Sequence, residues 1–370
     1  MAKKTKPGKI NMEDVAKLFN KKSGMSVAHN LKNANPTDVK QWIPTGSRWL
    51  DSIICKGELA GIPVGKITEI AGLESTGKSY MACQIALNAQ KMGIDVIYFD
   101  SESAISSQFL QRMGIDLDRF LYVQATSVEE VLEYIEAALG LGQQYLFIWD
   151  SLALTPSKSD LEGDFNPLSS MAVKPRILSK GMSKLTIPLA NEQCTLLVLN
   201  QLKTNITSNI SEALTTPWFT PGGKALIYTY SLRIWLTGRK SKASYVTNDK
   251  NHRIGSEVKA TLKKSRFGTD GRVCTFKIIW GDDEAVIKDE ESWLEAIKGS
   301  EKLVSGGAWY TLKYNDKEWK FQSKNWIEKL KDPDFKKAVL DIMQEEIITN
   351  FETKAVEASR FYELEGEGEE

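Results

Sequence analysis

The feature that most constrains this chain is the octapeptide Gly72–Ser79, in which four residues separate two glycines and Lys-Ser follows. Glycine lets the backbone turn so that successive N–H groups point at phosphate oxygens, and the lysine adds a compact positive charge. The serine hydroxyl suits a magnesium ion bound to those phosphates. The residues that we expect to form this phosphate-binding loop are Gly72, Leu73, Glu74, Ser75, Thr76, Gly77, Lys78 and Ser79.

The segments on either side of this loop favour a strand–loop–helix unit. Residues 66–71 are typical of a strand, and residues 79–92 have the spacing of a helix. A helix that begins at the loop directs the positive end of its dipole at the phosphates. A glycine-rich turn before an ordinary helix is the alternative. The flanking pattern favours an ATP-binding P-loop over that turn.

Composition excludes several classes of protein. The 370 residues are 42% hydrophobic and carry 48 basic and 48 acidic side chains, so net charge indicates no particular partner. Cys55, Cys83, Cys194 and Cys274 are far apart in the sequence, which predicts buried free thiols and no metal site. No apolar run is long enough for a signal peptide or a membrane span. We therefore expect a cytoplasmic protein without membrane contact.

Apolar runs and helical patterns alternate through the middle of the chain. Strands are predicted at 96–100, 121–123, 145–150 and 196–201, helices at 107–113 and 128–141, and further strand-like runs at 225–236, 256–262 and 273–280. This alternation predicts an α/β fold with a mostly parallel sheet covered on both faces.

One strand ends in a carboxylate that fits a nucleotide site. Asp150 closes the run 145–150, and an acid at that position can hold a nucleotide-bound magnesium ion. An unrelated strand-end Asp is the alternative, but the P-loop favours the functional interpretation. We expect Ser79 and Asp150 to be the metal ligands.

Three further side chains are candidates for the nucleotide site. Glu102 follows the run 96–100, which we expect to lie next to the P-loop strand, where a carboxylate can activate water for attack on the γ-phosphate. Gln201 ends a later strand, and its amide can bond the γ-phosphate. Phe109 can stack on adenine. A solvated acid, a strand-end amide and a core aromatic are the respective alternatives.

Composition also predicts the organisation of the chain. Residues 1–41 hold a Lys-rich tail and a short amphipathic helix at 11–22, whose apolar stripe must be buried on its own domain or on a neighbouring subunit. Residues 42–284 form the core. Residues 285–362 form a small α/β module rich in Trp and Lys. Residues 363–370 form an acidic tail that either competes with an acidic ligand for the basic module or only solubilises the chain.

These motifs, in this order, resemble the RecA-type recombinases, namely bacterial RecA and its phage relatives such as UvsX. The resemblance extends from about residue 45 to residue 326 and is fainter beyond. The segments that carry it are Thr45–Asp51, Gly72–Ser79, Asp100–Glu102, Asp150–Pro156, Asn200–Gln201, Lys264–Arg266 and Gly307–Tyr310.

The resemblance implies a RecA-like P-loop ATPase core with an N-terminal oligomerisation helix and a small C-terminal DNA-binding domain. It implies a recombination protein of a bacterial or phage-infected cell that uses ATP and Mg²⁺, polymerises on single-stranded DNA as a helical filament and exchanges strands with homologous duplex. ATP would lie between subunits. One subunit would supply the P-loop with catalytic Glu102, Lys78 and Gln201, and the next would supply Lys264 and Arg266.

The resemblance also places two DNA-binding loops at 157–171 and 203–223, stretches that lack apolar periodicity. Ile206, or Trp218 with Phe219, could wedge between bases or stack on them. The residues that fall on matching positions are Met171, Arg176, Ser179, Lys203, Ile206, Gly222, Gly223 and Lys224.

Two other functions share part of this pattern. A hexameric ring motor such as a helicase has the same P-loop and acids, and a nucleotide-switched structural filament would not need DNA loops. The N-terminal helix and the Trp- and Lys-rich module favour the recombinase over the ring motor. The length of the two loops argues against the structural filament.

Overall fold

The computed structural model describes residues 11–24, 26–31, 35, 38–55, 57–103, 105–163, 173–206, 215, 217–238, 244–280 and 286–348. Met171, most of the second half of the first loop and the acidic tail 363–370 lie outside these residues, as does much of the second loop. Among the described helices, none is long and apolar enough to cross a membrane.

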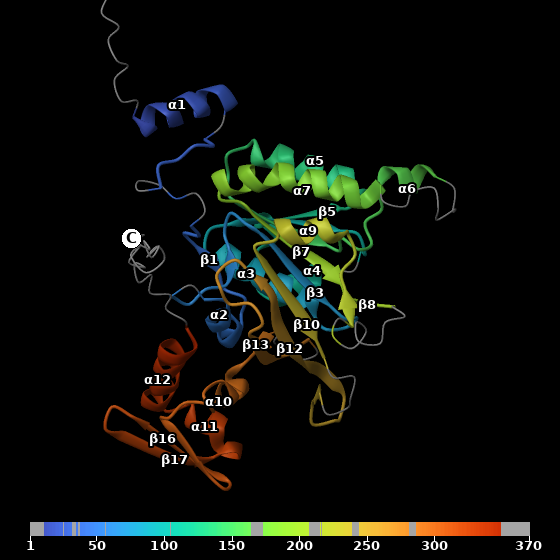
Figure 1. The fold of residues 1–370 in the computed structure, drawn as a ribbon. Coiled ribbons are helices and arrows are strands. Elements are labelled where there is room, and N and C mark those ends of the chain that lie inside the picture. The colour runs from blue at the N-terminus through green and yellow to red at the C-terminus, as the bar shows by residue number, and fades with distance from the viewer. Residues whose placement is uncertain are drawn as a thin grey trace, which may run out of the picture.

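A sheet of ten strands forms the centre of the described chain (Figure 1). Its order is β14 (Val286–Lys288), β13 (Val273–Ile279), β12 (Arg253–Ser265), β10 (Leu232–Thr237), β3 (Ile67–Gly72), β7 (Thr195–Gln201), β6 (Tyr145–Asp150), β4 (Asp95–Asp100) and β5 (Phe120–Gln124), with β11 (Tyr245–Thr247) paired to β12. The strands from β10 to β5 are parallel, and the remaining pairings are antiparallel. The predicted α/β class with a mostly parallel sheet is confirmed.

The strand order corrects one prediction. Strand β4, which precedes Glu102, does not lie next to the P-loop strand β3, because β7 and β6 lie between them. Strand order is set by which helices cross over which face, and the local sequence does not encode it.

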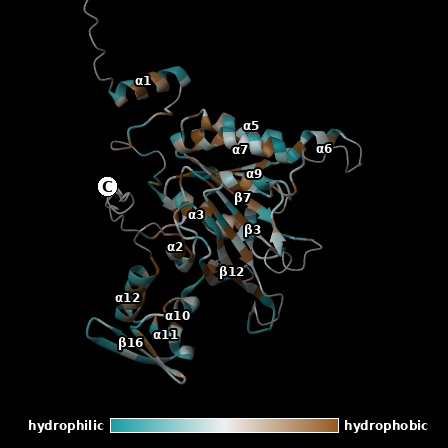
Figure 2. Cartoon of the chain, in the orientation of Figure 1, coloured by the Kyte–Doolittle hydropathy of each residue, from teal (hydrophilic) through white to brown (hydrophobic). Residues whose placement is uncertain are grey.

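Helices cover both faces of the sheet. One face carries α2 (Arg48–Ile54), α3 (Lys78–Lys91) and α4 (Ser107–Arg112), and the other carries α5 (Val128–Leu139), α7 (Val173–Asn191) and α9 (Lys224–Thr229). Successive side chains of a strand point to opposite faces, so Ile148 packs in the first layer while Phe147 and Trp149 pack in the second. Figure 2 shows hydrophobic residues gathered along the central strands and on the inner sides of these helices.

One predicted strand is partly a helix. Residues 225–236 were expected to be β-like throughout, whereas the first half is the helix α9 and only the second half is the strand β10. A short apolar run does not by itself distinguish a buried strand from a helical turn. The two φ-positive glycines before α9, Gly222 and Gly223, mark the turn that starts it.

Helix α1 (Met12–Ser23) is the predicted N-terminal amphipathic helix, and Asn11 caps it by accepting from the Glu13 N–H. Figure 1 shows it outside the core. None of its residues is buried, and Met12, Leu18 and Phe19 are 75%, 63% and 53% exposed. Within the described chain its apolar stripe therefore has no covering surface.

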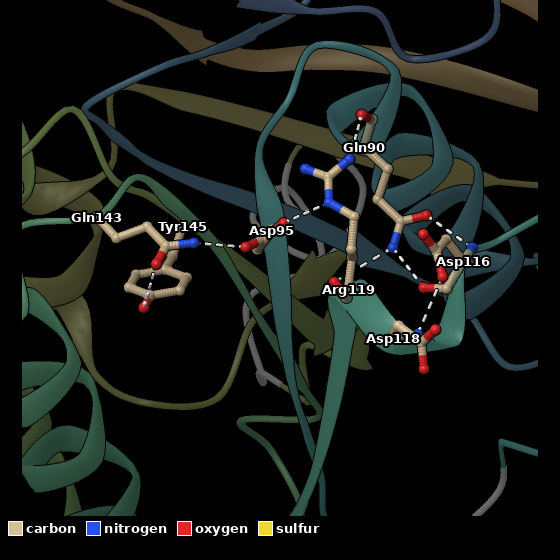
Figure 3. A network of polar contacts seen from close by, with 7 residues as sticks. All are labelled: Gln90, Asp95, Asp116, Asp118, Arg119, Gln143 and Tyr145. Atoms are coloured by element: carbon tan, nitrogen blue, oxygen red, sulfur yellow. Dashed lines mark hydrogen bonds and ion pairs between the residues drawn. The ribbon is translucent and has the colours of Figure 1, made fainter.

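Polar contacts fix the amino-terminal ends of β4 and β5 (Figure 3). The Arg119 Nε donates to Asp95 Oδ1 at 2.6 Å, and its Nη1 donates to the Gln90 carbonyl at 3.0 Å. Gln90 in turn donates to the Asp116 carbonyl and accepts from the Asp116 N–H. These bonds tie the end of α3 to the edge of the sheet through the 3₁₀ turn Leu117–Arg119.

The C-terminal module has its own three-stranded sheet, and its buried side chains continue the hydrophobic cluster that packs around α2 and α3. Its elements are β15 (Leu303–Gly306), β16 (Trp309–Tyr314), β17 (Lys317–Gln322), α10 (Trp293–Ala296), α11 (Trp326–Lys329), α12 (Pro333–Ile342), the 3₁₀ turns Glu290–Ser292 and Ser323–Asn325 and the π-helical turn Met343–Ile347. Phe321, Trp326 and Phe335 pack edge to face or tilted with centroids 5.3 to 5.6 Å apart. Such contacts make a small aromatic core.

Two buried carboxyl groups lie where this module joins the main core. Asp289 accepts from the Ser47 hydroxyl and the Trp49 N–H at 3.0 and 2.8 Å. Asp51 on α2 accepts from the Thr45 hydroxyl at 2.7 Å, and burial raises its pKa to about 8. Asp51 is therefore largely protonated at neutral pH.

Candidate nucleotide site and DNA loops

The predicted P-loop joins β3 to α3, and its glycines are required by close approach. Gly77 has φ of 81°, and a Cβ there would lie 2.7 Å from Ile278 Cδ1. A Cβ on Gly72 would lie 2.5 Å from Thr76 Oγ1, which itself donates to the Leu73 carbonyl at 2.8 Å. A side chain at Gly72 would therefore displace Thr76 of the loop, and one at Gly77 would be strained by the positive φ and would push the Ile278 side chain aside.

Lys78 is the cation at the start of α3. Its Nζ donates to the Gly72 and Leu73 carbonyls at 3.3 and 3.0 Å, so the side chain curls over the loop. Burial lowers the pKa of Lys78, and the carboxylates of Asp150, Glu102 and Glu74 oppose that shift. The lysine is thus held close to where a phosphate would bind.

Ser79 and Asp150 come together as predicted for metal ligands. The Ser79 hydroxyl and the Tyr98 hydroxyl each donate to Asp150 Oδ2 at 2.6 Å. Burial raises the pKa of Asp150, and these two hydrogen bonds counteract the shift. A hydroxyl beside a carboxylate is an oxygen donor set that fits Mg²⁺, which takes its other ligands from nucleotide phosphates and water.

Glu102 reaches the site although its strand is distant from β3. Asp100 Oδ1 accepts from the Glu102 and Ser103 N–H groups, both at 2.8 Å, and so folds the chain back after β4. The Ser151 hydroxyl then donates to Glu102 Oε1 at 2.9 Å. Ser151 follows the metal-site acid directly, so Glu102 is oriented from the same strand end that carries Asp150.

A cavity of about 820 Å³ lies over these groups. The predicted residues that line it are Glu74, Ser75, Gly77, Lys78, Ser79, Glu102, Asp150 and Gln201. The cavity is also lined by Tyr80, Leu202, Arg253 and Trp280, which no local sequence pattern marks as nucleotide-site residues. The structure therefore brings the predicted catalytic and metal residues into one site.

Phe109 does not line this cavity. Its ring packs against Tyr80 at a centroid distance of 4.7 Å, and Tyr80 faces Trp280 at 6.0 Å. The Arg253 guanidinium lies 4.1 Å from the Tyr245 ring centroid and 5.2 Å from that of Trp280. Arg253 begins one long strand and Trp280 follows the next, so a hairpin prediction for 253–279 would have placed them together.

Lys264 and Arg266 lie toward the opposite ends of the strands, away from the P-loop. Lys264 pairs with Arg233 of β10, and the Arg266 N–H donates to the Ser231 carbonyl, near the amino-terminal end of β3. The Lys264 Nζ donates to the Ile227 carbonyl at 2.6 Å. Burial and the nearby Arg266 charge lower the pKa of Lys264. The chain does not bring this pair to its own P-loop.

Five of the predicted DNA-contact residues lie where α7 and α9 begin, namely Arg176, Ser179, Gly222, Gly223 and Lys224. Arg176 and Ser179 lie in the first two turns of α7, and a Cβ on Gly223 would lie 3.2 Å from Pro175 Cβ. Pro175 is the third residue of α7, where a missing N–H is tolerated, and the helix continues past it. Lys224 begins α9 directly after the glycine pair.

The second loop is a short hairpin at its base. β8 (Lys203–Thr204) pairs with β9 (Trp218–Phe219), and the Asn205 N–H donates to the Pro217 carbonyl at 2.9 Å. Ile206 is 94% exposed. Trp218 and Phe219 are the alternative to Ile206 for contacting bases. Trp218 is partly buried and packs against a cluster of Ala71, Leu202 and Trp235, while Phe219 is 44% exposed.

Comparisons with known proteins identify the family. The sequence model of the RecA N-terminal domain matches residues 8–284. A mitochondrial DNA repair protein recA homolog of Dictyostelium discoideum is 29% identical over 82% of this chain and 64% of its own length. Protein RecA of Fusobacterium nucleatum subsp. nucleatum and of Symbiobacterium thermophilum are each 28% identical, over 82% and 85% of this chain and 75% and 85% of their own lengths.

These matches confirm the resemblance to RecA-type recombinases over the ring-motor and structural-filament interpretations. Members of this family carry out homologous recombination. The chain belongs to the RecA family, and it is a DNA-dependent ATPase that uses ATP with Mg²⁺, binds single- and double-stranded DNA and forms filaments.

Proposed function

We propose that each ATP is hydrolysed between two copies of this chain. One copy supplies the P-loop with Glu102, Asp150 and Gln201, and the next copy supplies Lys264 and Arg266. The observation that carries this proposal is the separation of the two sets, which lie toward opposite ends of the strands of one sheet. A cation acts on phosphate charge only at close range, so Lys264 and Arg266 must act on another copy's nucleotide.

In the first copy, each side chain has one task. The N–H groups of the P-loop and Lys78 bind the phosphates, while Ser79 and Asp150 hold Mg²⁺, which neutralises phosphate charge when bound. Glu102, oriented by the Ser151 hydroxyl at 2.9 Å, accepts a proton from the attacking water. Gln201 lies in the same cavity, where its amide can contact the γ-phosphate.

In the second copy, Lys264 lies near the end of β12 and Arg266 just beyond it. They stabilise the charge that develops on the γ-phosphate oxygens as the bond to the leaving group breaks. Phe109 supports the adenine site indirectly, because it packs on Tyr80, which lines the cavity. The exposed stripe of α1 is buried on the neighbouring copy, which accounts for a helix without buried residues.

The DNA site of the proposal lies at the start of α7 and α9. Arg176, Ser179, Lys203 and Lys224 supply polar and charged contacts to phosphates, and Gly222 and Gly223 supply backbone N–H groups. Ile206 is exposed enough to insert between bases, and Met171 belongs to the first loop. The residues 285–362 form the duplex-binding domain, and we assign the chain to the cytoplasm of a bacterial or phage-infected cell.

Mixing two inactive variants tests the shared site. Glu102→Gln and Arg266→Ala should each hydrolyse ATP poorly with single-stranded DNA. In a one-to-one mixture, random neighbours form wild-type interfaces in about a quarter of positions, because head-to-tail contacts join different surfaces. We expect about that fraction of the wild-type rate to return.

The control mixes Glu102→Gln with the double variant Glu102→Gln/Arg266→Ala, which cannot form a wild-type interface. No recovery is expected there. Absence of recovery in the first mixture as well, although the two variants co-assemble on DNA, would mean that Arg266 acts within its own chain and would overturn the shared site.

A further inference from the structure

A buried ion pair lies on the face of the sheet below the second DNA loop. Glu69 of β3 is 0% exposed and Arg233 of β10 is 6% exposed. The Arg233 Nε donates to Glu69 Oε2 at 2.6 Å, and Asn200 Nδ2 of β7 donates to Glu69 Oε1 at 2.9 Å. Both carboxylate oxygens are thus bonded, as a buried charge requires.

The same two donors also hold the carboxyl-terminal arm of the second loop. Arg233 Nη2 donates to the Thr220 hydroxyl at 2.9 Å, and Asn200 Nδ2 donates to the Pro221 carbonyl at 3.0 Å. These two loop residues come directly before Gly222. The arm that leads to the proposed phosphate contacts is therefore bonded to the P-loop strand through one carboxylate.

An apolar contact reinforces this connection. Trp218 packs against a cluster of Ala71, Leu202 and Trp235, and Leu73 of the P-loop packs against the same cluster. Consecutive strand residues point to opposite sides, so Phe219 faces solvent while Trp218 faces the sheet. One tryptophan of the loop therefore shares its packing surface with a P-loop residue.

The connection is short at the nucleotide end. Asn200 precedes Gln201, and Leu202 follows it, so the residues on both sides of the proposed γ-phosphate contact belong to the connection. A shift of Gln201 must move the Pro221 bond, the Leu202 packing or both. Packed groups of this kind change between discrete arrangements and transmit displacement.

We propose that Trp218 and Thr220 are positioning residues that transmit the nucleotide state from the P-loop and Gln201 to the second DNA loop. The inference rests on the proposed function, because it assumes that this loop binds DNA. The two residues contact neither ATP nor the reacting atoms. They act through Arg233, Asn200 and the apolar cluster.

Steady-state hydrolysis at varied single-stranded DNA concentration tests this role. Thr220→Val removes the acceptor of Arg233 and leaves the Glu69–Arg233 pair intact, so we expect the DNA-saturated rate to fall about five-fold. Trp218→Ala should lower it about ten-fold and Trp218→Phe less, since Phe keeps part of the packing. The rate without DNA and the binding of ATP should stay at wild-type values.

Thr204→Val is the matched control, because Thr204 is an exposed residue of the same hairpin, opposite Trp218. It should leave the DNA-saturated rate unchanged. Phe219→Ala should raise the DNA concentration needed for half-maximal rate without changing the saturated rate.

Two results would overturn the proposal. If Trp218→Ala changes only the DNA concentration required, Trp218 contacts DNA directly. If Thr220→Val lowers the DNA-free rate as much as the DNA-saturated rate, the connection supports the nucleotide site alone. A wild-type enzyme whose hydrolysis does not respond to DNA would instead contradict the proposed DNA role of the loop.

Discussion

Strand β12 carries basic side chains at both ends, and their surroundings differ. At its beginning, Arg253 lines the chain's own nucleotide cavity and lies between the rings of Tyr245 and Trp280. Near its end, Lys264 donates to the Ile227 carbonyl, and Arg266 just beyond donates to that of Tyr228. At about 3.4 Å per residue, the two ends of this 13-residue strand are about 40 Å apart.

The difference shows how one strand can serve two nucleotides. Charges separated by several Debye lengths hardly interact, so Arg253 and Arg266 cannot stabilise the same phosphate group. Strand β12 is antiparallel to β10 and carries the chain from the P-loop end of the strands to their opposite end. The beginning of β12 thereby belongs to the chain's own site, and its end is available to the next copy.

The largest effect is expected at Glu102, the proposed base, because neither end of β12 can promote hydrolysis without it. Glu102→Gln should lower hydrolysis about 10²- to 10⁴-fold while ATP still binds, because an amide cannot accept the proton of water. Hydrolysis and equilibrium binding of ATP measure the two steps separately. Glu257→Gln, which changes an exposed acid of β12 that does not line the cavity, is the control and should change the rate little.

The end of β12 gives the next largest effect. Arg266→Ala should lower the DNA-stimulated rate about a hundred-fold, as loss of a transition-state donor does, and Arg266→Lys should keep part of it. ATP binding to the unassembled chain should not change. Lys259→Ala, an exposed cation of the same strand, is the control. A normal rate in Arg266→Ala would confine β12 to its own site.

The beginning of β12 gives a smaller effect of another kind. Arg253→Ala should raise the ATP concentration for half-maximal rate about five- to ten-fold, because a charge-assisted contact to the nucleotide is lost. Arg253→Lys should recover little, since lysine lacks the planar group that stacks between two rings. Binding measured with ATP and with ADP would show whether the γ-phosphate is involved. Unchanged binding would make Arg253 a structural residue.

Part of this site could be predicted from sequence because it is local. The P-loop is one contiguous pattern, and Asp150 and Gln201 each end an apolar strand. Parallel strands present their carboxyl ends at one edge, so these residues had to meet. Glu102 lies in the predicted cavity, but the predicted reason is wrong. Strands β7 and β6 separate β4 from β3, and Glu102 reaches the cavity because the chain folds back after β4.

The remainder depends on contacts that local sequence does not encode. Arg253 and Trp280 enter the cavity only because two long antiparallel strands return to the P-loop edge. The sequence alone does not show which side of the second loop Trp218 takes, and pairing of β8 with β9 is what turns it toward the sheet. The sequence predicts a strand where the structure has α9, because six residues are too few to show a helical period.

Asp51 provides a test far from both ends of β12, with the smallest expected effect on the reaction. It lies on α2 beside Asp289 and Arg48, and burial raises its pKa to about 8. The folded chain therefore keeps a proton that the unfolded chain releases above about pH 4. The free energy of unfolding should fall as pH rises from about 4 to 8, by at most about 1.4 kcal/mol per pH unit for this group.

Asp51→Asn should remove that part of the pH dependence, because an amide releases no proton, while ATP hydrolysis and its stimulation by DNA stay unchanged. Urea denaturation at several pH values measures the slope. Burial also raises the pKa of Asp289, so a smaller slope of the same sign should persist. If the variant keeps the full wild-type slope, Asp51 is ionised in the folded chain. If the variant loses DNA stimulation, the junction with the C-terminal module affects the shared site, and the two ends of β12 are not independent of it.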